Sequence, residues 1–254
     1  MITGYGHFVT LAESLQWDEK ALDLSADVEA WPQLTDAERR NVLGLVAGFC
    51  IAEAAVAEHL TNFQAAASKD DSMQACFTSQ ARDEARHARF FERIADEVIG
   101  VPGNNFPERL DALRDTANPE IVDLFEERLP STAARLADDH ESLTGAVGLY
   151  HMILEGVVLL AGQHGLLDVL DRLSVKMPGL HKGMELVVRD ERWHIGFGSR
   201  VIQSADLVDD EVSQLLKEGE EAAMAWGNLI SDSAIEEAAQ LHRRRLRSVG
   251  IKFW

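Results

Sequence analysis

Residues 82–90 read RDEARHARF, and residues 189–197 read RDERWHIGF. The two stretches agree at Arg, Asp, Glu, His and Phe in the same register. Each contains Glu-x-x-His inside a helix-like pattern, and residues three apart share one face of a helix. A single Glu-x-x-His is usually an exposed surface pair, but the repeated Arg-Asp and Phe make this pair specific. The repeat therefore predicts two halves of one metal site inside a helical bundle.

The composition favours a helical protein that does not bind nucleic acid. The 254 residues are 46% hydrophobic, include only 6 Pro and carry a net charge of −19. Such a composition favours helix, whereas nucleic-acid-binding proteins need a basic surface. Cys50 and Cys76 form no CxxC pair, and the N-terminus lacks a signal-peptide pattern. The most apolar stretch, residues 43–60, contains two glutamates and is too short to cross a bilayer. We expect a cytoplasmic protein with no membrane span.

Start and stop signals predict four long helices, at about residues 35–67, 72–99, 140–173 and 180–204. Thr35 to Glu38 form a capping box, and Gly100 ends the second helix. Residues 1–34 are expected to form an arm with a short helix near residues 15–22. Shorter helices are expected over residues 108–139, with a break at Pro130, and over 208–231 and 233–248. No hairpin or alternating strand pattern competes, so we predict an all-α fold with a four-helix bundle core and additional helices. Residues 35–254 would form a single dimetal-binding domain.

The other two long helices each carry a glutamate in an apolar run. Glu53 lies in FCIAEAAV, residues 49–56, and Glu155 lies in MILEGVVL, residues 152–159. Burying a carboxylate in such a run is costly unless it is paired or bound to metal. Each of these glutamates comes one helix before a repeated motif, so the helix pairs look like duplicated halves. The predicted metal ligands are Glu53, Glu84, His87, Glu155, Glu191 and His194.

Four carboxylates and two neutral imidazoles would balance the charge of two divalent cations. Carboxylate-rich nitrogen and oxygen ligation suits Fe or Mn better than Zn or Cu. A ligating His usually donates its other N–H to a carboxylate. We therefore expect Asp190 to hold His87 and Asp83 to hold His194, crossing between the helices. His151, one turn before Glu155, is either a residue that faces the site or a buried core histidine.

These motifs resemble the ferritin-like dimetal carboxylate superfamily, and within it the relatives of the ribonucleotide reductase small subunit. Trp17-Asp18, DLSAD at residues 23–27 and Trp31 are similar to the N-terminal arm of that family. The resemblance implies a ferritin-like bundle with two metal ions per chain, as Mn/Fe or Fe/Fe. It also implies O₂ and an external electron donor as partners, and a homodimer.

A closer resemblance is to the ribonucleotide-reductase-like ligand-binding oxidases. It rests on YHMILEG at residues 150–156, MPG at residues 177–179 and the second motif followed by Gly198. Those oxidases hold a long-chain fatty acid beside the metals and form a Val–Tyr ether cross-link, which corresponds here to Val56 and Tyr150. On a regular helix Tyr150 lies about 140° away from Glu155. Tyr150 must therefore reach the cluster through a bulge or an interhelical approach, or both residues are simply part of the core.

The sequence thus predicts an O₂-activating dimetal oxidase or oxygenase that acts on an apolar, fatty-acid-like ligand. One alternative is a radical-generating small subunit of a ribonucleotide reductase. The radical Tyr of that family, four residues after the first His ligand, is replaced here by Phe91, and some subunits with Phe there use a Mn/Fe cluster. A biosynthetic N-oxygenase and a non-enzymatic, ferritin-like metal store also stay open.

Overall fold

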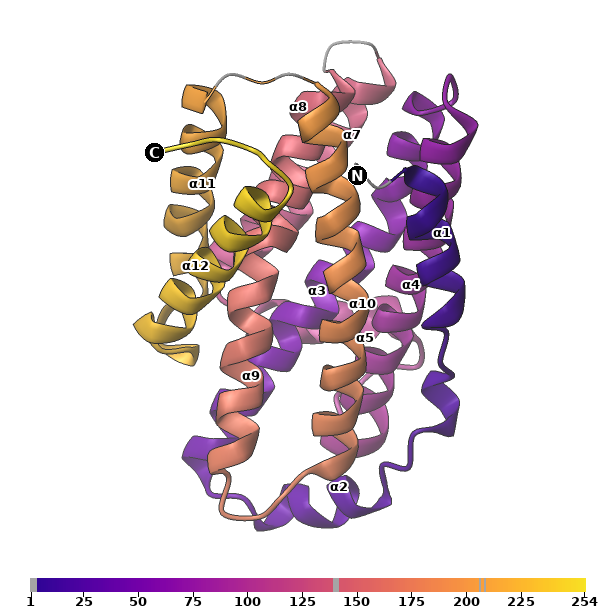
Figure 1. Ribbon diagram of the computed structural model, residues 1–254. Helices are drawn as coiled ribbons and strands as arrows, with labels where there is room; N and C mark the ends of the chain where they lie inside the picture. The colour runs from indigo at the N-terminus through magenta and orange to yellow at the C-terminus, as the bar shows by residue number, and fades with distance from the viewer. Residues whose placement is uncertain (1–3, 139–141, 206, 208) are drawn as a thin grey trace.

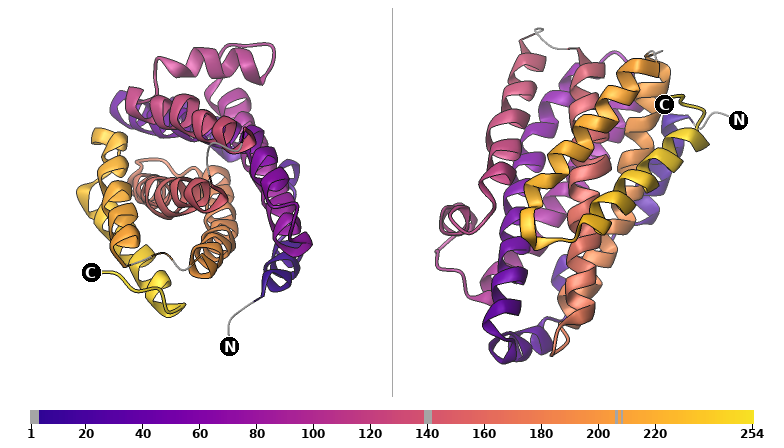
Figure 2. Two further views of the ribbon diagram at one scale, coloured as in Figure 1. Left: turned by 90° about the horizontal axis from the view of Figure 1, so that it is seen from above. Right: turned by 90° about the vertical axis from the view of Figure 1, so that its left-hand side faces the viewer.

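The computed structural model describes residues 4–138, 142–205, 207 and 209–254, and all regular structure in them is helical. The core consists of α3 (Asp36–Ala66), α4 (Asp71–Arg93), α10 (Pro178–Ser204) and one long continuous helix. The continuous helix comprises α8 (Leu143–Val147), the π-helical segment η5 (Gly148–Leu159) and α9 (Leu160–Arg172). These long helices run along one another in Figure 1 and are seen nearly end-on in the left-hand view of Figure 2. The predicted all-α fold with a four-helix core is confirmed.

Local signals place the ends of α3 and α4. The Thr35 hydroxyl accepts a hydrogen bond from the Glu38 N–H at 3.3 Å, and Glu38 accepts one from the Thr35 N–H at 2.8 Å. Asp70 caps α4 by accepting hydrogen bonds from two backbone N–H groups. The π-helical segment η3 (Ile94–Ile99) extends α4 and ends at Gly100, whose φ of 75° lies in the left-handed region that glycine adopts without strain.

The arm differs from its prediction. It contains α1 (Tyr5–Ser14), η1 (Glu19–Ala21), α2 (Ser25–Ala30) and η2 (Trp31–Gln33). The short helix expected near residues 15–22 is reduced to the 3₁₀ helix η1, because α1 ends at Ser14 and the chain turns so that Trp17 points into the bundle and hydrogen bonds Asp190. The arm packs along α4 and α10 (Figure 1). We propose that residues 35–254 form one domain onto which this arm docks.

The segment after α4 contains α5 (Phe106–Arg114), α6 (Pro119–Asp123), the π-helical η4 (Leu124–Arg128) and α7 (Leu129–Ala137). The expected break at Pro130 is wrong, because helix continues from Pro119 to Ala137. The π turn comes just before Pro130, which is the second residue of α7. The wider turn of η4 changes the hydrogen-bond pattern there, so the missing N–H of proline is tolerated. The predicted start of the third long helix at His140 lies outside the described residues.

The last helices cover the outer side of the core. They are α11 (Asp209–Ala223), the 3₁₀ segment η6 (Met224–Leu229) and α12 (Asp232–Ser248). α11 packs on η5, and α12 crosses α9 (Figures 1 and 2). α3 and the helix over residues 143–172 are long and apolar enough to cross a membrane, but 72% and 83% of their most apolar windows are buried in the protein. Such burial is typical of core helices.

Candidate metal centre

The four long helices bring the six predicted ligands together in two overlapping groups. Glu53, Glu84, His87 and Glu191 form one, and Glu84, Glu155, Glu191 and His194 form the other. In each group the candidate ligand atoms all lie within 4.8 Å of one another. Glu84 and Glu191 belong to both groups, so they lie where carboxylates that bridge two ions would lie. No side chain of the six is more than 2% exposed.

Both histidines direct Nδ1 toward the carboxylates. His87 Nδ1 lies 3.3 Å from Glu84 Oε2 and 3.6 Å from both Glu53 Oε2 and Glu191 Oε1. His194 Nδ1 lies 3.0 Å from Glu84 Oε1 and 3.2 Å from Glu191 Oε2. The opposite ring nitrogen of each histidine faces away from the cluster, toward an aspartate.

Several polar atoms of the cluster have no hydrogen-bond partner among the described residues. They include both carboxylate oxygens of Glu53, His87 Nδ1, Glu155 Oε2 and Glu191 Oε1. Each such buried, unpaired group costs about 1–3 kcal/mol. Two divalent cations would satisfy these lone pairs and offset the carboxylate charge. The cluster can therefore hold two metal ions, and its oxygen-rich ligation suits Fe and Mn.

The pKa shifts show how strongly the cluster favours positive charge. Burial raises the pKa of Glu53 to about 8, and burial together with Glu191 raises that of Glu155 well above its usual value. Burial alone would lower the pKa values of His87 and His194, but the surrounding carboxylates raise both well above the usual value. Metal ions would displace these protons, so metal binding is expected to release protons.

Asp190 and Asp83 occupy equivalent positions behind the two histidines. Asp190 Oδ2 lies 3.2 Å from His87 Nε2 and accepts a hydrogen bond from Trp17 Nε1 at 2.7 Å. Asp83 Oδ2 lies 3.6 Å from His194 Nε2 and accepts a hydrogen bond from Trp193 Nε1 at 3.1 Å. Each aspartate thus lies beside the histidine of the other motif.

Arg86 joins these two aspartates. Its Nη2 donates to Asp83 Oδ1 at 2.7 Å and to Asp190 Oδ2 at 2.8 Å, and its Nη1 donates to Gln16 Oε1 at 2.8 Å. Arg86, Gln16 and Trp17 were not predicted as parts of the site. Arg86 lies within the first motif but is not repeated in the second, and the two arm residues lie far from the motifs in the sequence, so no local signal marked them.

Tyr150 reaches the cluster because η5 is a π-helix. Hydrogen bonds between residues five apart bring such residues closer to one face than in an α-helix, and five residues separate Tyr150 from Glu155. The Tyr150 hydroxyl donates to Glu84 Oε1 at 3.1 Å. Gln80 Nε2 donates to Tyr150 Oη at 3.0 Å, and His151 Nε2 lies 3.0 Å from Gln80 Oε1. Burial and the nearby Glu155 raise the pKa of Tyr150 well above its usual value, so the phenol stays protonated.

Val56 and Phe91 both lie in the core. Val56 is 1% exposed and follows Glu53 by about one turn of α3. The Phe91 ring is fully buried and stacks on Phe49, with ring centres 5.0 Å apart and planes 5° apart. Phe91 therefore offers no phenol to the cluster. The other tyrosine, Tyr5, packs against Phe197 from the arm.

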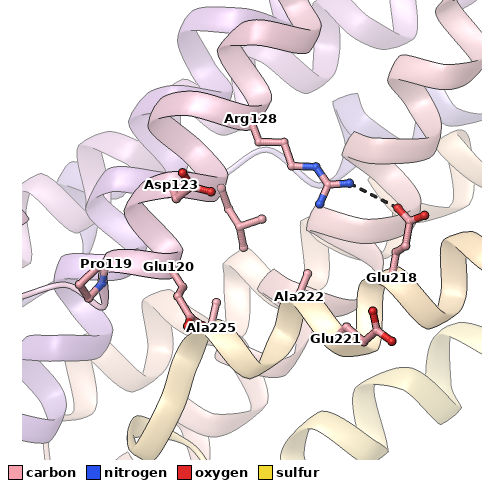
Figure 3. A pocket seen from close by; sticks show the side chains of 9 residues that line it. Pro119, Glu120, Asp123, Arg128, Glu218, Glu221, Ala222 and Ala225 are labelled. Carbon is pink, nitrogen blue, oxygen red and sulfur yellow. Dashed lines mark hydrogen bonds and ion pairs between the residues drawn. The ribbon is translucent and has the colours of Figure 1, made fainter.

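A surface pocket of about 590 Å³ lies apart from the cluster (Figure 3). It is formed by α6, η4, α11 and η6 and crossed by an ion pair between Arg128 and Glu218 at 3.4 Å. None of the six candidate ligands lines it. The pocket walls are Pro119, Glu120, Asp123, Leu124, Arg128, Glu218, Glu221, Ala222 and Ala225. The buried cluster has the unpaired ligand atoms that this pocket lacks, so we take the cluster as the functional site.

Comparison with known protein families is consistent with a buried site for two metal ions. The sequence model of the family described as "Ribonucleotide reductase, small chain" matches residues 5–241. The chain belongs to this family. The chain is also similar to the ribonucleoside-diphosphate reductase subunit beta of Chlamydia pneumoniae. It is 23% identical over 273 residues, which cover 93% of this chain and 74% of the relative.

Solved structures of R2-like ligand-binding oxidases are similar to this small-chain family member in fold. A variant with an anaerobically reconstituted Mn/Fe cofactor has a TM-score of 0.76 and 23% identity, covering 97% of this chain and 90% of that one. Another with a non-activated Mn/Mn cofactor has a TM-score of 0.76 and 24% identity, with the same coverage. These structures confirm the predicted ferritin-like fold of the ribonucleotide reductase small subunit. Membership of the small-chain family confirms the prediction of a dimetal-carboxylate oxidoreductase.

Proposed function

We propose that this chain is an O₂-activating dimetal oxidase or oxygenase that acts on an apolar, fatty-acid-like ligand. The observation that carries the proposal is the contact between the Tyr150 phenol and Glu84, one of the two carboxylates shared by both groups of candidate ligands. The six predicted ligands would hold an Mn/Fe or Fe/Fe pair, which when bound supplies the O₂ chemistry. An Mn/Fe cofactor in structurally similar oxidases supports this choice of metals.

The protein's own residues would orient the centre and keep it dry. Glu84 and Glu191 would help to hold both ions, since both residues belong to the two groups. Asp190 and Asp83 would fix the ring planes of the two histidines by accepting their outer N–H bonds. Fully buried apolar side chains on either side of Glu53 and Glu155, such as Phe49 and Leu154, would exclude water and favour an apolar ligand.

We further propose that Val56 and Tyr150 form an ether cross-link. The new bond would join Val56 Cβ to Tyr150 Oη, and the two hydrogens lost, as two protons and two electrons, would pass to O₂. The Tyr150 ring packs 5.5 Å from that of Phe63 on α3, and Phe63 lies seven residues after Val56, on the same face of that helix. This packing supports an approach of the phenol to the side of α3 that carries Val56.

An external electron donor, a homodimer and a cytoplasmic location are also proposed. All three are supported by membership of the small-chain family. Burial of the two most apolar helices inside the bundle further supports a soluble protein.

A second candidate function is a radical-generating small subunit that acts with a ribonucleotide reductase large subunit. It is favoured by the family match and by the Chlamydia pneumoniae relative. Phe91 weighs against a tyrosyl radical at the position next to the first motif, because the stacked Phe91 ring has no hydroxyl. Ribonucleotide reduction that appears only when a large subunit is added would establish this second function in place of the first.

The test is reconstitution of the metal-free protein with Mn and Fe in air. We expect about two ions per chain, O₂ uptake and an intact mass lower by two hydrogens, which Tyr150→Phe abolishes. Glu84→Ala and Glu191→Ala should each lower the metal content, whereas the control Glu58→Ala, at an exposed position on α3, should not. Unchanged metal content in both ligand variants would refute the dimetal centre. Organic extraction followed by mass spectrometry would identify any bound apolar ligand.

A further inference from the structure

Gln80 lies on α4 one turn before Glu84 and is fully buried. Both the oxygen and the nitrogen of its side-chain amide have hydrogen-bond partners. Its Oε1 lies 3.0 Å from His151 Nε2. Its Nε2 donates to Tyr150 Oη at 3.0 Å and to Glu155 Oε1 at 2.8 Å. A single side chain thus contacts the candidate cross-link residue, a candidate metal ligand and a histidine, all on η5.

The chemistry of these groups fixes the direction of the hydrogen bonds. The amide NH₂ faces Glu155 Oε1, which accepts whether or not the other oxygen, Oε2, carries a proton, and the amide oxygen faces His151. Burial and the nearby His194 lower the pKa of His151 to about 3, so His151 is neutral with one N–H. His151 Nδ1 has no partner among the described residues, which agrees with the N–H being on Nε2 and donated to Gln80.

The Tyr150 oxygen therefore accepts from Gln80, and its own hydrogen is left to donate to Glu84. The chain runs in one direction, from His151 through Gln80 and Tyr150 to Glu84. The rings of Phe77 and Phe197 pack against His151 at 6.0 and 5.6 Å and hold the start of the chain in place. Apolar packing on one end and a candidate metal ligand on the other leave the amide little freedom to flip.

We propose that Gln80 is a positioning residue that makes Tyr150 a hydrogen donor toward Glu84 and aims its oxygen lone pair away from that carboxylate. This rests on the proposed function, in which the Tyr150 O–H bond is broken during cross-linking. Without Gln80 the phenol would lose the donor that fixes its rotation. With a carboxylate in its place, the Tyr150 hydrogen would turn from Glu84 toward residue 80.

The first arm of the test needs no metal. The chain has only 2 Tyr, so in a Tyr5→Phe background a ¹³Cζ-labelled tyrosine reports on Tyr150 alone. We expect the hydroxyl proton of Tyr150 in the metal-free full chain to exchange about fivefold faster in Gln80→Met, the factor that corresponds to loss of one hydrogen bond of ~1 kcal/mol. The matched control is Gln163→Met, because Gln163 is equally buried but has no partner among the described residues. An exchange rate in Gln80→Met equal to that of the parent overturns the proposal.

The second arm follows the two-hydrogen mass loss after Mn/Fe loading in air. Gln80→Glu keeps the shape of the side chain but replaces the donors by an acceptor, so a purely structural role predicts near-parent rates. Our proposal predicts at least a fivefold slower loss in both Gln80→Met and Gln80→Glu and no change in Gln163→Met. If Gln80→Met fails to fold, Gln80→Glu decides alone. If the parent protein shows no mass loss, the proposed cross-link fails, while the exchange measurement still decides the role of Gln80.

Discussion

Arg86 gives the sharpest prediction for stability, because one buried cation serves two buried carboxylates. Its side chain is 3% exposed, and those of Asp83 and Asp190 are 0% exposed. In Arg86→Met both charge-assisted hydrogen bonds, at 2.7 and 2.8 Å, are lost. Each such bond contributes about 1.5–3 kcal/mol, and breaking a buried pair by removing one partner costs about 3–5 kcal/mol. We expect the free energy of unfolding to fall by about 3–5 kcal/mol.

The assay is urea unfolding of parent and variant, together with thermal unfolding. A loss of about 4 kcal/mol should lower Tm by roughly 8–16 °C in a protein of this size. Arg82→Met is the matched control, because Arg82 lies on the same helix but is exposed, and it should change stability by less than about 0.5 kcal/mol. If Arg86→Met costs less than about 1 kcal/mol, the aspartates do not depend on this cation and the reasoning is refuted.

Three further predictions test other parts of the molecule. Asp190→Asn should weaken metal affinity about 10- to 100-fold, because a neutral amide orients the ring of His87 less strongly than the carboxylate does; titration calorimetry giving an unchanged affinity would contradict it. In Gly198→Ala the new Cβ would lie 2.2 Å from the Cβ of His151, so overpacking should cost about 1–3 kcal/mol in urea unfolding, and a neutral result would show that α10 shifts freely. Backbone hydrogen bonds lower the pKa of Glu38 from 4.5 to about 2. The ionised Glu38 therefore stabilises the protein fully above pH 4.5, and this effect is lost as pH falls through 2. We expect the difference in free energy of unfolding between the parent and Glu38→Gln to shrink as the pH is lowered. A difference that stays constant with pH would disprove this.

Much of the fold follows from local signals in the sequence. The capping box at Thr35 and the stop at Gly100 act over a few residues, so the ends of α3 and η3 could be predicted. The six candidate ligands could be found from the sequence because a repeated motif and two carboxylates in apolar runs rarely occur together by chance, and the structure brings these six side chains together. At these positions the structure that the local sequence favours is the one found in the folded protein.

Other features depend on contacts between distant segments. Trp17 lies just after α1, and its N–H bonds Asp190, 173 residues later; no pattern near Trp17 encodes that contact. The same holds for Gln80, which pairs with residues about 70 positions away. The continuation of helix through Pro130 was missed because a π turn lies beside it, and propensity rules assume α-helical hydrogen bonding.

The π-helical segment η5 also has an evolutionary consequence. A π turn contains one more residue than an α turn, so a single-codon deletion between Tyr150 and Glu155 could restore a regular helix while leaving α9 and α10 in register. Tyr150 and Glu155 would then be four residues apart, which on a regular helix still places them on one face, so the phenol would stay beside Glu84. Related chains could therefore differ by one residue between this tyrosine and this glutamate and still keep a phenol beside the cluster, so a fixed spacing in the sequence is a poor guide to which of them have it.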